Sequence, residues 1–242
     1  MRPFFTVFGY RVAAFALMAI AASVVAFGIL LLCTRGKSHQ HDAVNYFFFA
    51  ACGAIVGAWG LYVMLNFPLF IGAVFYGGLI GGIFTMWAYS KLFCVPLLPF
   101  MDLFAPILLV THAIGRVGCF LAGCCYGVEV GPGHLLAVVY PEYSLGAPDG
   151  VYLLAVPLIE AAANLLIALV LFLRVGKHRP GIVAALYMMA YAGMRFVLEF
   201  YRGDAARGIL LGLSTSQWIS IGVFISGLCC YIKSNRNRVD LL

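Results

Sequence analysis

Long apolar runs separated by short polar gaps extend along the whole chain. Backbone polar groups inside lipid must be satisfied within each crossing segment, and the alternating pattern of a β-barrel strand is absent. A helical crossing of a hydrocarbon layer needs about 20 mostly apolar residues. The pattern therefore predicts an all-α integral membrane protein with about seven transmembrane helices. The predicted spans cover residues 12–33, 43–65, 69–90, 94–115, 151–173, 181–200 and 209–232.

The composition agrees with a membrane protein. Hydrophobic residues make up 64% of the 242 positions and charged residues only 10%, whereas soluble domains average about 25% charged residues. A formal net charge of +6 would suggest nucleic acid in a soluble chain, but here the basic residues lie between apolar runs. We interpret them as topology signals and contacts with membrane lipid, and expect no nucleic-acid partner. Without an internal repeat or linker, residues 1–242 are predicted to form a single domain.

Lys and Arg also predict the orientation, since cytoplasmic loops carry an excess of them. The N-terminus is predicted outside the membrane and the C-terminus in the cytoplasm. The one long connection, about residues 116–150, then faces outward as a folded arm, or cap, between the fourth and fifth helices. The predicted cytoplasmic side holds Arg35, Lys37, Lys91, Arg174, Lys177, Arg179, Lys233, Arg236 and Arg238, and the other side holds Arg2, Arg11, Arg116, Arg195, Arg202 and Arg207.

Ionisable residues in or beside the spans mark candidate sites, because a charge at the bilayer centre costs about 2.5–3.5 kcal/mol on insertion scales. Arg195, Glu199 and Arg202 are spaced four and three residues apart, which predicts one helical stripe. Such a stripe can pair internally, with Glu199 holding Arg195, and still offer guanidinium groups to an anion; the alternative is a purely structural ion-pair ladder. Arg116 is either a site residue or an arginine reaching the membrane interface.

Three further polar residues lie within the apolar runs. Asp102 is expected to cap or brace a helix, and His112 to make one hydrogen bond inside the bundle. Glu160, near the outer end of the fifth run, is either a site residue or an anchor for its helix.

Cys119, Cys124 and Cys125 gather where the fourth run meets the arm. Zinc usually takes four ligands, with about two to four residues between paired ones, and these cysteines give no such frame. A disulfide is an alternative on an oxidising face. Packing of small side chains is the favoured interpretation. We therefore predict no metal site and no cofactor.

Three motifs, in this order along most of the chain, resemble the bacterial prolipoprotein diacylglyceryl transferases. They are Tyr76–Gly82 (YGGLIGG), Gly115–Gly127 (GRVGCFLAGCCYG) and Arg195–Arg202 (RFVLEFYR). The likeness is greatest to a cysteine-containing branch of that family. It implies an enzyme of the bacterial inner membrane that moves the diacylglyceryl group of phosphatidylglycerol onto the thiol of a lipobox cysteine. The acceptor cysteine belongs to the signal peptide of a preprolipoprotein, and glycerol phosphate is released outside.

The resemblance also implies roles for individual residues. Arg116 matches the signature arginine, and with Arg195 it is expected to hold the lipid phosphate, while Tyr76 stands where the family usually has histidine. As a catalytic set we therefore expect Arg116, Arg195 and Tyr76. The expected substrate-binding residues are Arg116, Arg195, Glu199, Arg202, Gly77, Gly78, Gly127 and Cys119.

The departures from the family pattern keep alternatives open. Cys119 replaces the usual asparagine, Cys124 an acidic residue, and Phe15 a tyrosine of the first helix. A protein with these changes is either a transferase or an altered paralogue that binds lipid, serves as an accessory protein, or uses another acceptor. A transporter and a thiol-redox protein are weaker alternatives.

Overall fold

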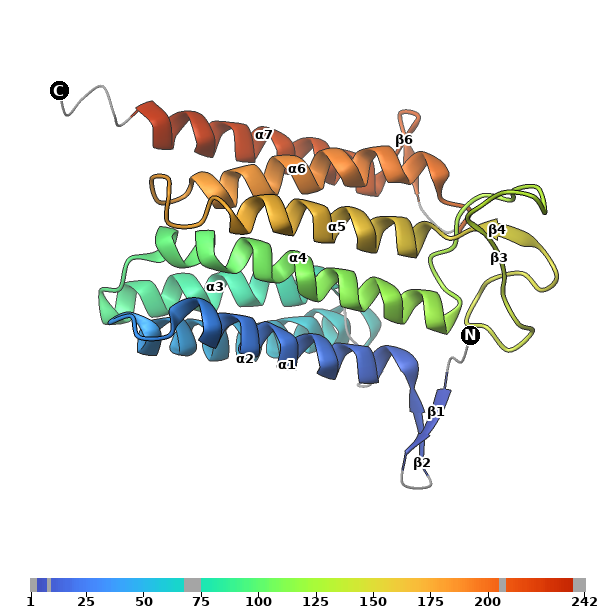
Figure 1. Ribbon diagram of the computed structural model, residues 1–242, viewed down its shortest axis with the longest axis horizontal. Helices are drawn as coiled ribbons and strands as arrows, with labels where there is room; N and C mark the ends of the chain where they lie inside the picture. Colours follow the sequence, from blue (N-terminus) through green and yellow to red (C-terminus); the bar gives the residue numbers. More distant parts are fainter. Residues whose placement is uncertain (1–3, 8–9, 68–74, 205–207, 237–242) are drawn as a thin grey trace. The chain divides into compact units, whose positions relative to one another are not determined.

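Seven α-helices form among the residues that the computed structural model describes, which are 4–7, 10–67, 75–204 and 208–236. Five are long and apolar enough to cross a membrane: α1, α2, α4, α7, and α6 together with the 3-10 turn that follows it. The predicted class, an all-α multi-pass membrane protein, is therefore confirmed. The helices are α1 (Ala14–Thr34), α2 (Gln40–Asn66), α3 (Phe75–Phe93), α4 (Leu97–Ala122), α5 (Val156–Phe172), α6 (Ile182–Leu198) and α7 (Thr215–Arg236) (Figure 1).

Short antiparallel hairpins accompany the helices. The first precedes α1, the second lies in the arm between α4 and α5, and the third precedes α7 (Figure 1). The strands pair as β1 (Phe4–Val7) with β2 (Tyr10–Ala13), β3 (Ala137–Val139) with β4 (Tyr152–Leu154), and β5 (Ile209–Leu210) with β6 (Leu213–Ser214).

Several predicted boundaries are wrong. Residues 116–122 continue α4, so the arm begins at Gly123, whose φ of 74° ends the helix. Residues 151–155 belong to the arm, because Tyr152–Leu154 pairs with β3. Residues 209–214 form the third hairpin, and residues 12–13 lie in β2. Hydropathy could not separate residues 12–13, 151–155 and 209–213 from the spans, because these segments are as apolar as the helices that follow them.

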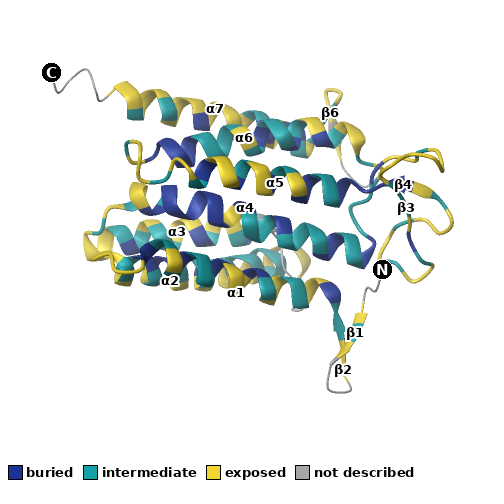
Figure 2. Ribbon diagram, in the orientation of Figure 1, coloured by how far each residue is buried: buried dark blue, intermediate teal, exposed yellow. Residues whose placement is uncertain are grey.

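The chain forms two compact units, which we describe separately: residues 1–26 with 102–242, and residues 27–101. In the first unit, α4, α5 and α6 share a buried core, and their packed faces are dark in Figure 2. Asp102 braces the start of α6, since its two carboxylate oxygens each accept a backbone N–H, from Gly181 and Ala184, at 2.7 Å. This is the role expected of Asp102. The core residues are Ala105, Leu109, Ala168, Leu171 and Val183.

In the second unit, glycines let α2 and α3 approach closely along their lengths. A Cβ added at Gly57 would collide with the carbonyl oxygen of Gly77, and one at Gly81 with that of Gly53. Each helix thus supplies two glycines four residues apart, as in the small-xxx-small pattern of membrane helix pairs. Thr85 adds a hydrogen bond from its hydroxyl to the Phe49 carbonyl at 2.8 Å. Gly77, predicted to bind substrate, thus has a packing function here.

We expect Gly81→Ala to reduce the free energy of unfolding by about 1–3 kcal/mol, the usual cost of overfilling a packed interface. Gly60→Ala is the matched control, because a Cβ there meets nothing within 4 Å and alanine favours helix by up to about 1 kcal/mol. Thermal unfolding of the purified protein in detergent measures both. Equal stability of Gly81→Ala and wild type would contradict the close approach of these helices.

Candidate functional site

A buried ion pair joins α4 to α5. Nε of Arg116 lies 3.0 Å from Oε1 of Glu160, whose side chain is 1% exposed. The same Nε donates to Nε2 of His112 at 3.2 Å, and His112 lies 3.6 Å from Glu160. Breaking such a pair by removing one partner leaves an uncompensated charge, so the three side chains hold one another in place.

Two further buried or partly buried polar side chains lie on the helices that carry this region. Asn164 lies one turn beyond Glu160 on α5, is fully buried, and has no hydrogen-bond partner for either amide atom among the described residues. The ring of Tyr191, on α6, lies 5.3 Å from that of His112. Sequence reasoning missed Asn164 and Tyr191. The signal for each was present, because Asn164 follows Glu160 and Tyr191 precedes Arg195 by four residues, on the same helical face.

Arg195 is the second buried arginine of this region. It forms an ion pair with Glu199 through Nη1 and Oε2 at 2.6 Å, and its Nη2 donates to the Ser216 hydroxyl, at the start of α7, at 3.3 Å. The pairing of Arg195 with Glu199 is as expected. The single stripe through Arg202 is wrong, because α6 ends at Leu198, a 3-10 turn (η1, Glu199–Tyr201) follows, and Arg202 is extended.

The two arginines belong to one polar region. Both Arg116 and Arg195 act electrostatically on His112, and both act on Tyr191. The side chain of Arg116 is 14% exposed and that of Arg195 is 9% exposed, so both are largely buried but still partly accessible. Two largely buried guanidinium groups in one polar region, each paired with a carboxylate, suit a bound phosphate, to which arginine donates two hydrogen bonds at once.

Arg202 lies against the arm between α4 and α5 instead of on α6. Its Nε and Nη2 donate to the two carboxylate oxygens of Asp204, the former at 2.8 Å and the latter at 2.6 Å. Its backbone pairs with Gly127, whose N–H donates to the Leu154 carbonyl at 2.9 Å. A Cβ at Gly127 would collide with Leu154 and Val156, and one at Gly203 with Gly127 itself. Gly127 therefore lets three segments meet beside the end of α4; the predicted substrate-binding roles of Gly127 and Arg202 stay predictions.

The three clustered cysteines meet at this junction. Cys119 is on the last turn of α4, and the sulfur atoms of Cys119, Cys124 and Cys125 lie within 4.8 Å of one another. Hydrogen bonds from the Cys119 and Cys124 thiols, together with the Arg202 guanidinium, lower the pKa of Cys125. Burial, followed by the influence of these cysteines, raises the pKa of Tyr140 to about 12.

Tyr76, Gly77 and Gly78 lie at the start of α3, in the second unit. The side chain of Tyr76 lies outside the described part of the structure. Gly78 faces α2 more loosely than Gly77 does, since a Cβ there would stand 3.2 Å from the Ala54 carbonyl oxygen. The roles of Tyr76 and Gly78 in the reaction stay predictions.

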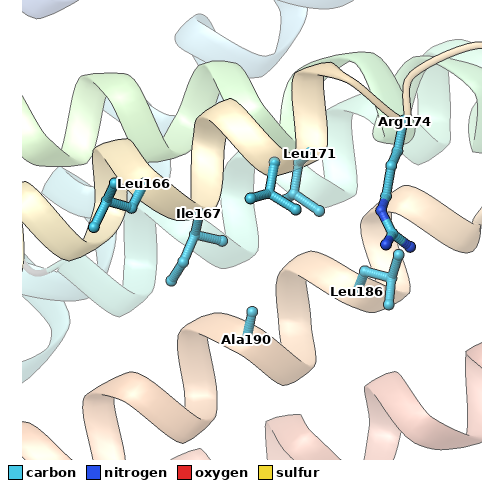
Figure 3. Close-up of a pocket in the computed structure, with 7 residues that line it drawn as sticks. Leu166, Ile167, Leu171, Arg174, Leu186 and Ala190 are labelled. Carbon is cyan, nitrogen blue, oxygen red and sulfur yellow. The ribbon is translucent and has the colours of Figure 1, made fainter.

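An apolar cavity of about 340 Å³ lies between α5 and α6, as Figure 3 shows. Ile167, on one wall, follows Glu160 by seven residues, or about two helical turns. Arg174 stands at one end of the cavity and supplies its charged group. The remaining lining, which suits a hydrocarbon chain, consists of Leu166, Ile167, Val170, Leu171, Leu186 and Ala190.

Comparison with known proteins places these residues in a family. The family model for prolipoprotein diacylglyceryl transferase matches residues 3–233. The chain is similar to a phosphatidylglycerol–prolipoprotein diacylglyceryl transferase of Clostridium tetani, 33% identical over 94% of this chain and 96% of that protein. A second such enzyme, of Clostridium perfringens, is 37% identical over 66% of this chain and 61% of its own length. One of Streptococcus pneumoniae is 30% identical over 84% and 82%.

We expect Glu160→Ala to destabilise the protein by about 3–5 kcal/mol, because it leaves the largely buried Arg116 without its carboxylate partner. Glu142→Ala, an exposed change in the arm, is the control and should leave stability within about 0.5 kcal/mol of wild type. Unfolding in detergent measures both. Adding Arg116→Met to the Glu160→Ala variant should restore part of the lost free energy of unfolding. If the two substitutions instead lowered the free energy of unfolding additively, the pairing would be contradicted.

Proposed function

This chain belongs to the prolipoprotein diacylglyceryl transferase family, and we propose that it transfers the diacylglyceryl group of phosphatidylglycerol to a lipobox cysteine. The acceptor is the cysteine in the signal peptide of a preprolipoprotein, and glycerol phosphate is the leaving group. The observation that carries this proposal is the buried pair of arginines, Arg116 and Arg195, each held by its own glutamate. The family match covers both residues.

The reaction creates negative charge on the departing phosphate. The thiol sulfur attacks the glycerol carbon that bears the phosphate ester, a carbon–sulfur bond forms, and the carbon–oxygen bond breaks. Its electron pair leaves with the phosphate oxygen, so donors aimed at that oxygen stabilise the transition state. Arg116 and Arg195 are the proposed donors. Glu160 and Glu199 act as positioning residues, because they hold these guanidinium groups rather than touch the lipid.

The acceptor thiol must also lose its proton, which passes to water or to the released glycerol phosphate. A cysteine is already a few per cent thiolate at neutral pH, and two arginines nearby favour the anion. This reduces the need for a strong base at position 76, where tyrosine, with an ordinary pKa of about 10, is a poor base and a fair hydrogen-bond donor. We assign Tyr76 to orienting the lipid ester.

The proposed setting is the bacterial inner membrane, with the N-terminus outside and the C-terminus in the cytoplasm. Arg174, Lys177 and Arg179 lie in the turn between α5 and α6, and α7 ends in Lys233 and Arg236. Within the first unit, this turn and the end of α7 lie opposite the arm that carries β3 and β4 (Figure 1). Basic residues at that end support placing the arm, and the arginine pair near it, on the outer side.

We expect Arg116→Ala and Arg195→Ala each to lower the transfer rate by about 10²–10³-fold, the usual effect of removing a donor to developing charge. Purified protein is mixed with phosphatidylglycerol and a lipobox peptide, and the peptide mass and released glycerol phosphate are followed. Lys177→Ala, at the opposite end of the first unit, should retain activity. If wild type forms no product with several lipids and thiol acceptors, the protein is an accessory or lipid-binding relative instead.

We expect Tyr76→Phe to weaken transfer by about tenfold, the loss of one hydrogen bond worth about 1.5 kcal/mol. Because a donor, unlike a base, need not ionise, the pH dependence of the residual rate should match that of wild type. Full activity in Tyr76→Phe would remove Tyr76 from the reaction. A changed pH profile would make it a proton acceptor.

A further inference from the structure

The three clustered cysteines take no part in the transfer step proposed above. The substrate-binding role expected of Cys119 stays a prediction. Cys119 and Cys124 meet through an ordinary helix ending, in which Gly123 is left-handed and the Cys124 N–H donates to the Cys119 carbonyl at 3.1 Å. Packing alone would explain that pair. It does not explain the third sulfur, on Cys125, which turns back to join them.

The backbone of Cys125 is strained in order to make this turn. Its φ is +60°, a left-handed conformation that costs a residue with a side chain roughly 1–2 kcal/mol. A surrounding structure that maintains such strain is common where a side chain has a specific task. Here the strained residue completes a group of three sulfur atoms, each within 4.8 Å of the others.

Two buried donors beside the sulfurs lack acceptors. Tyr140 is fully buried, its ring packs near Gly123, and its hydroxyl has no hydrogen-bond partner in the described parts of the chain. The guanidinium of Arg202, 3% exposed, lies beside Cys125, and its Nη1 likewise has no partner there. An unsatisfied buried donor costs about 1–3 kcal/mol. Both donors would be satisfied if the sulfurs were anionic.

We propose that Cys119, Cys124 and Cys125 bind a thiophilic d10 metal ion, such as zinc(II) or copper(I), as three thiolates. A planar trio of sulfurs about 2.3 Å from a metal stands roughly 4 Å apart, which the group reaches with little movement. Soft thiolate ligands select such ions over magnesium or calcium. Tyr140 and Arg202 donate to the bound thiolates, which is the usual task of groups around a metal site.

A disulfide fits these observations less well. It would join two of the three sulfurs and leave the third as a thiol, and its neutral sulfur atoms accept hydrogen bonds weakly. The donors of Tyr140 and Arg202 would then stay unsatisfied. Metal binding instead forms three metal–sulfur bonds, and every cysteine of the three that still carries a proton loses it to solvent. No oxidant is required.

The bound ion would brace the arm against α4. Cys119 lies on α4, the helix that carries Arg116, while Cys124 and Cys125 lie at the start of the arm. Arg202 directly follows η1. Residues 145 and 147 already tie the arm to the end of α4, through N–H donation to the carbonyls of Ala122 and Gly123. A metal there would fix the junction in a single arrangement independently of the transfer chemistry.

The full-length protein, purified in detergent under a non-thiol reductant, tests the site. Zinc(II) and copper(I) are titrated separately, followed by elemental analysis and X-ray absorption. We expect one ion per chain, sulfur ligands at about 2.3 Å, proton release, and a higher melting temperature when metal is bound. Cys119→Ser and Cys124→Ser should lose the ion, and Tyr140→Phe should bind it about 10–100-fold more weakly.

The matched control is the double variant Cys229→Ser with Cys230→Ser, an exposed neighbouring pair on α7. It should bind the ion as wild type does, and loss of the ion in this variant would place the metal elsewhere. Failure of both ions to bind wild type would overturn the proposal. So would a linkage between two of the three clustered sulfurs, detected by alkylation and peptide mass before reduction.

Discussion

The pairing of Arg116 with Glu160 is the constraint around which the first unit is arranged. An isolated charge cannot remain in an apolar bundle, so the two must meet, and α4 and α5 must pack with these residues in register. The polar residues His112, Tyr191 and Asn164 then gather on the same side. Arg195 and Glu199 form a second buried ion pair, at the end of α6. The site that we propose for the lipid phosphate is thereby arranged before a lipid binds.

The arm depends on close backbone approach rather than on charge. Gly127 and Gly203 allow segments from three parts of the chain to cross where no side chain fits. Arg202 does not continue the charged stripe of α6, because it lies beyond the end of the helix and its guanidinium pairs with Asp204. The arm is thus tied to the end of α6 at the same junction where the three clustered cysteines meet.

In the second unit, glycine performs a comparable task between α2 and α3. In lipid there is no water to expel from a helix interface, so close packing itself must supply the attraction. The four glycines at positions 53, 57, 77 and 81 bring the two backbones into contact. The glycines of the Tyr76–Gly82 motif therefore combine a packing task with the family resemblance that first drew attention to them.

Apolar runs, a short charge spacing and three motifs were sufficient to predict the membrane class, the family and the Arg195–Glu199 pair, because these depend on residues near in sequence. Asp102 as a helix brace also followed, since a buried carboxylate needs donors. Tertiary structure alone decided that Glu160 pairs with Arg116 and that three cysteines without a metal-like spacing converge. Those outcomes depend on helix packing and on the left-handed residues Gly123 and Cys125, neither of which hydropathy or spacing encodes.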